Sequence, residues 1–151
     1  MSRMQTVTRT PVQTAAMAVS AVFVLVGIAG FIPGLTTNFD QLHFAGHQSE
    51  AQLLGIFNVS VLHNLVHLLF GAVGLLMARS VRGAASYLVG GGVVYLLLWL
   101  YGLLVDHDSA ANFVPLNDAD NWLHLGLGLG MIALGLTLGK RSVPDNPRGG
   151  V

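Results

Sequence analysis

Long windows without any charged side chain dominate the hydrophobic pattern of this chain. These windows lie between Arg9 and Asp40, Glu50 and Arg79, Arg82 and Asp106, and Asp120 and Lys140. Each window reaches about the 20 residues that a helix needs to cross a hydrocarbon core roughly 30 Å thick. We therefore predict an all-α fold: a polytopic membrane protein whose four transmembrane helices form a bundle, with spans near residues 12–32, 53–78, 83–105 and 119–139.

The remaining segments divide the chain into one membrane domain and two short ends. Residues 1–11 are predicted to be an N-terminal segment, residues 12–139 the membrane domain and residues 140–151 a tail. Ser49 to Gln52 is typical of a capping box that opens the second span, and Asn117 with Asp120 is typical of an N-cap for the fourth. Short connections favour antiparallel neighbours in a compact bundle.

Charge along the chain predicts the orientation of the spans. Hydrophobic residues make up 53% of the sequence and charged residues 9%, which is too apolar for an ordinary soluble domain, so the lipid bilayer is the expected partner. The basic residues all fall on one side of the predicted spans: Arg3, Arg9, Arg79, Arg82, Lys140, Arg141 and Arg148. Cytoplasmic flanks are enriched in Lys and Arg, so we predict a multi-pass plasma (inner) membrane protein with both termini in the cytoplasm.

A cleaved signal peptide is the alternative interpretation of the first span. The apolar stretch over residues 15–32 is longer than the usual 7–15 residue core of such a peptide, so we favour a span.

The 19 glycines concentrate inside the spans, and Gly126–Gly130 and Gly135–Gly139 have GxxxG spacing. Small residues let membrane helices approach closely, within the bundle or between protomers, so a homo-oligomer or a larger membrane complex is a further possible partner.

Several classes of chemistry have no support in the sequence. The chain has no cysteine, which excludes disulfides, thiolate metal sites and cysteine nucleophiles. The glycines lie in apolar spans and are not accompanied by the strand, turn and polar phosphate site of a nucleotide-binding motif. No nucleic-acid partner is expected. No Ser-His-Asp arrangement stands out, so no catalytic signature is recognised and enzymatic activity is not expected.

Histidine is the residue type in this chain most suited to metal binding or proton transfer. All six histidines fall on the predicted outer half. On the second span, Ser60, His63, Asn64 and His67 share one face of the helix, and the small residues Gly71 and Gly74 continue it. On the fourth span, Asn117, Asn121 and His124 form a comparable face with Asp120 beside it. Polar groups facing lipid would lack partners, so the two faces are predicted to meet each other or a shared cavity.

Four interpretations of these faces stay open. A structural or accessory protein would use the histidines and asparagines to fix helix packing, with Ser60, Asn64, Asn117 and Asn121 as the packing stripe. A divalent transition metal could be bound by His63, His67 and His124 with Asp120. A b-type haem could be held by His67 or His63 paired with His124. A proton or small-solute pathway could use His63, His67 and Asp120.

Depth along the helices gives a preference for one histidine pair. With spans entering at Leu53 and Asp120 and a rise of about 1.5 Å per residue, His63 would lie about 15 Å, His67 about 21 Å and His124 about 6 Å below the boundary. His63 is therefore predicted to be the better cross-helix partner of His124. A weaker candidate cation site is the loop Asp106-His107-Asp108, together with Asp118 or His43.

Three stretches resemble a known family. They are LLGIFNVSVLHNLVHLLFGAVGLLMAR on the second span, NDADNWLHLGLGLGMIALG on the fourth, and FAGHQSEAQLLG in the first outer loop. They look like the signatures of an uncharacterised four-helix integral membrane protein family of actinobacteria and related bacteria, a domain of unknown function, and the likeness extends from about Val12 to Gly139. The resemblance implies the four-span architecture and supplies no activity, ligand or catalytic residue.

Overall fold

Four helices form the molecule, together with a small sheet at one end. The computed structural model describes residues 8–142, so most of the predicted terminal segments, with Arg3 and Arg148, lie outside it. The helices are α1 (Pro11–Ala29), α2 (Val61–Met77), α3 (Val81–Leu104) and α4 (Asp118–Arg141). A short 3₁₀ helix, η1 (Phe39–Gln41), and strands β1 (Thr36–Thr37), β2 (Gln52–Leu53) and β3 (Phe57–Asn58) complete the described elements. The predicted all-α four-helix bundle is confirmed.

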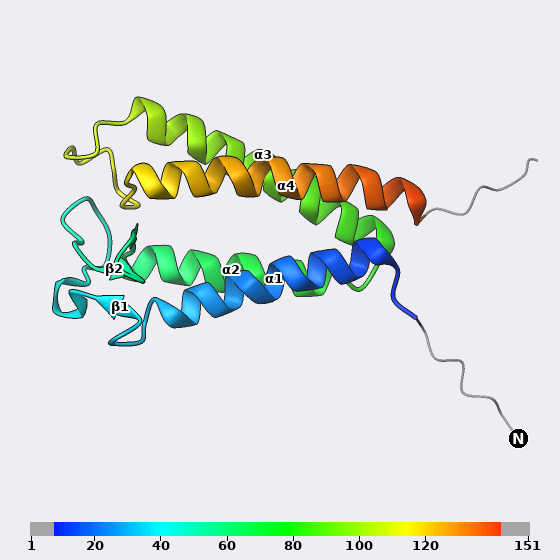
Figure 1. Ribbon diagram of the computed structural model, residues 1–151, viewed down its shortest axis with the longest axis horizontal. Helices are drawn as coiled ribbons and strands as arrows, with labels where there is room; N and C mark the ends of the chain where they lie inside the picture. Colours follow the sequence, from blue (N-terminus) through cyan, green and yellow to red (C-terminus); the bar gives the residue numbers. More distant parts are fainter. Residues whose placement is uncertain (1–7, 143–151) are drawn as a thin grey trace, which may run out of the picture.

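The helices alternate in direction along the bundle. In Figure 1, α1 and α3 run one way and α2 and α4 return, and the sheet and the α3–α4 loop lie at the same end of the bundle. We call this end, which carries the sheet and the 105–117 loop, the outer end, and the opposite one, where α2 turns into α3, the inner end. The strands pair antiparallel in the order β1-β2-β3.

The helices have the length and composition of membrane segments. α1, α3 and α4 are each long and apolar enough to cross a membrane, whereas α2 is a shorter apolar helix of 17 residues. Large apolar side chains also point away from the bundle: Leu69 is 66% exposed and Leu25 is 64% exposed. Extended apolar surface of this kind is rare on soluble monomers, and it indicates a membrane protein.

The second helix starts later than the sequence predicts. Ser60 is the N-cap of α2, and its hydroxyl accepts a hydrogen bond from the His63 N–H at 3.1 Å. The expected helical start near Leu53 is wrong, because residues 52–58 form the β2–β3 hairpin. Its turn carries positive φ at Leu54 (55°) and Gly55 (70°), which an α-helix cannot contain.

The predicted capping box at Ser49 is also wrong, since no helix begins there. The buried Ser49 hydroxyl instead donates to the Val59 carbonyl at 2.6 Å. The predicted N-cap of α4 is confirmed: Asn117 accepts from the Asp120 N–H at 2.9 Å, and the Asp120 carboxylate accepts from the Asn117 N–H at 3.0 Å.

Glycines bring paired helices together, as the sequence predicts, although not at every GxxxG position. A Cβ on Gly71 would lie 2.7 Å from the Ser20 carbonyl oxygen of α1, so α1 and α2 are in backbone contact there. Gly135 lies equally close to α3, and Gly139 is near Ala85. Gly126 and Gly130 instead face open space, so this GxxxG pair makes no contact within the described bundle.

The two helix pairs are repeats of one unit. The string Asn-x-x-His-Leu-x-x-Gly occurs in α2 from Asn64 to Gly71 and again in α4 from Asn121 to Gly128. The first residue of each string packs against a glycine near the end of the preceding helix. Asn64 lies against Gly30 and Asn121 against Gly102, where any Cβ would overlap the amide.

The correspondence extends to the first helix of each pair. Counting back from Gly30 and from Gly102, buried positions of α1 coincide with buried positions of α3: Val12, Ala16, Ser20 and Phe23 correspond to Ala84, Leu88, Gly92 and Tyr95. α1 packs along α2 and α3 along α4, while α1 and α3 contact each other across the bundle. The two pairs are therefore related by an approximate twofold rotation about an axis parallel to the helices.

Candidate functional site

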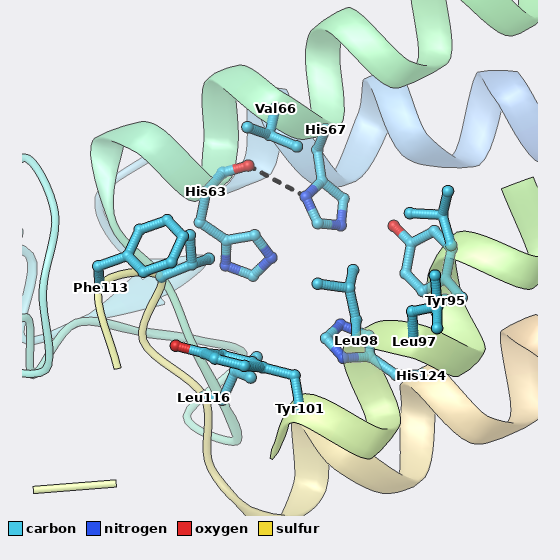
Figure 2. A pocket seen from close by; sticks show the side chains of 12 residues that line it. His63, Val66, His67, Tyr95, Leu97, Leu98, Tyr101, Phe113, Leu116 and His124 are labelled. Carbon is cyan, nitrogen blue, oxygen red and sulfur yellow. Dashed lines mark hydrogen bonds between the residues drawn. The ribbon is translucent and has the colours of Figure 1, made fainter. Parts of the chain in front are cut away.

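Three histidines border two cavities in the outer half of the bundle. His63 and His67 come from α2, and His124 comes from α4 on the opposite side of the first cavity (Figure 2). This first cavity, of about 370 Å³, is walled by α3 residues such as Tyr95 and Leu98. The second cavity, of about 240 Å³, lies on the α1 side of the same three histidines. The prediction that polar faces of the second and fourth helices meet a shared cavity is confirmed for the histidines.

The two cavities correspond to each other under the repeat. Leu98 of α3 lines the first cavity where Val26 of α1 lines the second, and both lie one turn before the glycine that receives the asparagine. Val66 of α2 and Leu123 of α4 are likewise equivalent. The site is therefore a pair of related, largely apolar spaces with histidines between them.

His67 and His124 are equivalent residues of the two repeats. Each occupies the same position counted from the start of its helix, α2 at Val61 and α4 at Asp118. The predicted depth mismatch between them is wrong, because it assumed that the second helix starts at Leu53. His63, which was predicted to be the better partner of His124, lies one turn closer to the outer end.

Backbone hydrogen bonds fix the rings of the two α2 histidines. His63 Nδ1 lies 3.0 Å from the Asn58 carbonyl oxygen, and His67 Nδ1 lies 3.0 Å from the His63 carbonyl oxygen. A carbonyl only accepts, so each Nδ1 donates, and the neutral ring keeps its lone pair on Nε2. In His124, Nδ1 is buried and has no hydrogen-bond partner in the described part of the chain.

Aromatic rings pack against one another and against two of the cavity histidines. Phe23 and Tyr95, equivalent residues of α1 and α3, stack with ring centroids 5.3 Å apart and planes 23° apart. Phe70 lies edge-on to Phe23 at 4.9 Å. Phe23 also contacts His67 at 5.6 Å, and Tyr95 contacts His124 at 5.2 Å. Each histidine of the equivalent pair thus lies beside one ring of the central stack.

The other predicted site residues lie at helix ends and helix contacts. Asp120 borders the second cavity, but its Oδ2 accepts from the Asn58 N–H at 3.1 Å as well as from Asn117. Ser60 and Asn117 are N-caps, and Asn64 and Asn121 lie against the glycines described above. In the outer loop, His107 Nε2 donates to the Gly102 carbonyl at 3.0 Å, so it is tied to the end of α3.

Comparison with known sequences gives a family for the chain. Residues 13–137 match the family described as a domain of unknown function, DUF4383. The chain belongs to this family. No curated protein and no solved structure matches it significantly. The matched region contains α2, α3 and both Asn-x-x-His-Leu-x-x-Gly strings, so the predicted membership of an uncharacterised domain family is confirmed.

The DUF4383 bundle has no ready cluster of metal-binding side chains among residues 8–142. No group of three or more His, Asp or Glu side chains there could hold a metal ion. Structural zinc is usually held by four protein ligands, and catalytic zinc by three. A metal site built from His63, His67, His124 and Asp120 therefore stays a prediction from the sequence.

Sequence reasoning missed the repeat and the aromatic stack. The Asn-x-x-His-Leu-x-x-Gly string was readable in both helices and would have shown that His67 and His124 are equivalent. Phe23 and Tyr95 carry no such signal, because an aromatic residue in an apolar helix is most often an ordinary packing residue. Only the structure shows that Phe23 lies beside His67 and Tyr95 beside His124.

Proposed function

We propose that this DUF4383 chain is a membrane haem protein in which His67 and His124 are the two axial ligands of one b-type haem. The observation that carries the proposal is that these equivalent histidines border the same pair of apolar cavities. When bound, a haem with two histidine ligands supplies one-electron redox chemistry. Bundle cores are common places for such cofactors.

The number of available ligands favours a haem over a free metal ion. A haem brings four nitrogens of its own and asks the protein for one or two axial ligands. A free transition metal needs three or four side chains, and residues 8–142 contain no such group. His67 and His124 suffice for the haem without His63 or Asp120.

Ring orientation supports the same proposal. Ligating histidines commonly donate their other ring nitrogen to a backbone carbonyl or a carboxylate, which fixes the ring and leaves Nε2 for the metal. His67 has this arrangement through its bond to the His63 carbonyl. His124 lacks such a bond, since its buried Nδ1 has no partner in the described part of the chain, so this support applies to His67 alone.

The shape of the bundle supports a flat ligand. α1 and α3 contact each other across the bundle, and α2 and α4 lie on opposite sides of that contact. A planar macrocycle between His67 and His124 would extend into both cavities, whose walls are mostly Leu, Val and aromatic side chains. Apolar walls suit the apolar faces of a porphyrin.

The other functions are less well supported by the geometry. A proton or solute pathway along the bundle would have to pass the rings of Phe23, Phe70 and Tyr95, which pack against one another. A purely structural or accessory protein needs neither the cavities nor histidines facing them. For localisation we propose the plasma membrane, with the basic inner end in the cytoplasm.

The test is haem binding by the purified protein. The chain is expressed with 5-aminolevulinic acid, purified in detergent and examined by visible spectroscopy, and apoprotein is titrated with haemin. We expect a Soret band and about one haem per chain, lost in both His67→Ala and His124→Ala. His47→Ala, in an outer loop, is the matched control and should keep the band. A folded wild type that takes up no haemin would overturn the proposal.

A further inference from the structure

A groove with two arginines lies between α1 and α2 at the inner end, far from the histidines. Its volume is about 570 Å³, and it is lined by Arg9, Gln13, Met17, Leu75, Ala78 and Arg79. Both arginine side chains are exposed. The proposed haem plays no part in forming this groove, so it stands apart from the proposed function.

The charge of the groove is uncompensated within the described chain. Every acidic residue in the part that the structure describes lies in an outer loop or in the first turn of α4, which is also at the outer end: Asp40, Glu50, Asp106, Asp108, Asp118 and Asp120. No carboxylate among residues 8–142 can therefore pair with Arg9 or Arg79. With no carboxylate partner in the described part of the chain, the two guanidinium groups can pair with a bound anion.

Gln13 forms hydrogen bonds to backbone carbonyl groups beside the two arginines. The last carbonyls of a helix are unsatisfied and carry the negative end of its dipole. Gln13 Nε2 donates to the Ala78 carbonyl at 3.1 Å and to the Arg79 carbonyl at 3.0 Å, so these groups at the end of α2 are already bonded. An anion in the groove would meet arginine side chains and not bare carbonyl oxygens.

The walls of the groove change from polar to apolar along the helices. Arg9 and Arg79 lie at the inner rim, while Met17 and Leu75 lie about one to two turns further into the bundle. We infer that the groove binds an anionic diacyl phospholipid, with its phosphate on the arginines and an acyl chain along Met17 and Leu75. Arginine forms strong, charge-assisted hydrogen bonds with phosphate, and basic pockets between membrane helices suit anionic headgroups.

The second repeat contains the equivalent groove, and it lacks these features. Between α3 and α4, a space of about 450 Å³ has Ala85 at the position equivalent to Gln13 and Leu136 at that of Arg79. Its single cation is Lys140. The two halves of the molecule have therefore diverged at the inner end, and the α3–α4 groove provides a control within the same chain.

The test measures protection by lipid in the detergent-purified full chain. Phosphatidylglycerol is titrated into the protein and the unfolding temperature is recorded, with phosphatidylcholine and inorganic phosphate in parallel. We expect phosphatidylglycerol to raise the unfolding temperature by several degrees, and the other two probes to leave it nearly unchanged. Arg9→Gln/Arg79→Gln should lose most of the rise, whereas Arg9→Lys/Arg79→Lys should keep much of it and Lys140→Gln nearly all of it.

Three results would overturn the inference. Equal protection of wild type and the Arg9→Gln/Arg79→Gln variant would show that the arginines do not bind the lipid. Equal loss in Lys140→Gln would show attraction to the whole basic end and not to this groove. Protection by inorganic phosphate alone would show that no acyl chain is recognised. Haem content is measured in the same samples, so that failure of the lipid inference is distinguished from failure of the proposed haem function.

Discussion

His63 and Asp120, equivalent residues of the two repeats, form hydrogen bonds to the backbone carbonyl and the backbone N–H of the same residue, Asn58. The His63 ring donates to the Asn58 carbonyl at 3.0 Å, and the Asp120 carboxylate accepts from the Asn58 N–H at 3.1 Å. The β3 strand is thereby tied to both α2 and α4. The repeat has diverged at this position, since one copy supplies a donor and the other an acceptor.

Removing the Asp120 carboxylate should destabilise the outer end of the bundle. Asp120→Ala would leave the part-buried N–H groups of Asn58 and Asn117 without their acceptor, at a cost of up to about 1–3 kcal/mol for each group. We expect a lower unfolding temperature in detergent. Asp118→Ala is the matched control, because Asp118 is exposed in the same helical turn, and an equal effect of both changes would contradict this role.

The glycines that receive the two asparagines should tolerate no side chain. A Cβ on Gly102 would overlap the Asn121 amide, and one on Gly30 would overlap Asn64, so the helices of each pair would have to move apart. We expect Gly102→Ala and Gly30→Ala to lower the unfolding temperature.

Gly126 provides the comparison, because a Cβ there meets nothing within the bundle. Gly126→Ala should be neutral or slightly stabilising, since alanine favours helix more than glycine by up to about 1 kcal/mol. If Gly126→Ala were as harmful as Gly102→Ala, the close contact would not be the cause.

Much of the fold could be predicted from charge alone, because a membrane helix has to exclude charged groups over its whole length. The residue at which α2 starts could not be predicted in this way. The run from Leu53 to Leu62 is mostly apolar and continues into the helix, and hydropathy does not distinguish a short hairpin from a helical turn. The turn at Leu54 and Gly55 depends on backbone angles that only the structure gives.

That one boundary decided how the candidate site was interpreted. A helix starting at Leu53 places His67 too deep to meet His124, while the start at Val61 places both at the same level. The helical spacing of His63 and His67 predicted that they share one helix face, and both border the same cavities as His124. Which of the two lies level with His124 depends on depth, and the sequence did not give the depth.

His63 should be dispensable for the proposed haem. It lies one turn outward of His67, and its Nδ1 serves to hold Asn58. We expect His63→Ala to keep the Soret band while lowering the unfolding temperature, because the Asn58 carbonyl loses its donor. Loss of the band in His63→Ala with retention in His67→Ala would instead favour the pairing of His63 with His124.

The most direct test of the account is the spin state of ferric haem in the protein, measured by electron paramagnetic resonance. Two histidine ligands give a low-spin signal, so the haem-loaded wild type should be low-spin. Any haem that remains in His67→Ala or His124→Ala should become high-spin, because one axial ligand is lost. A low-spin signal that survives both changes, or a folded wild-type protein that binds no haem, would contradict the assignment of His67 and His124.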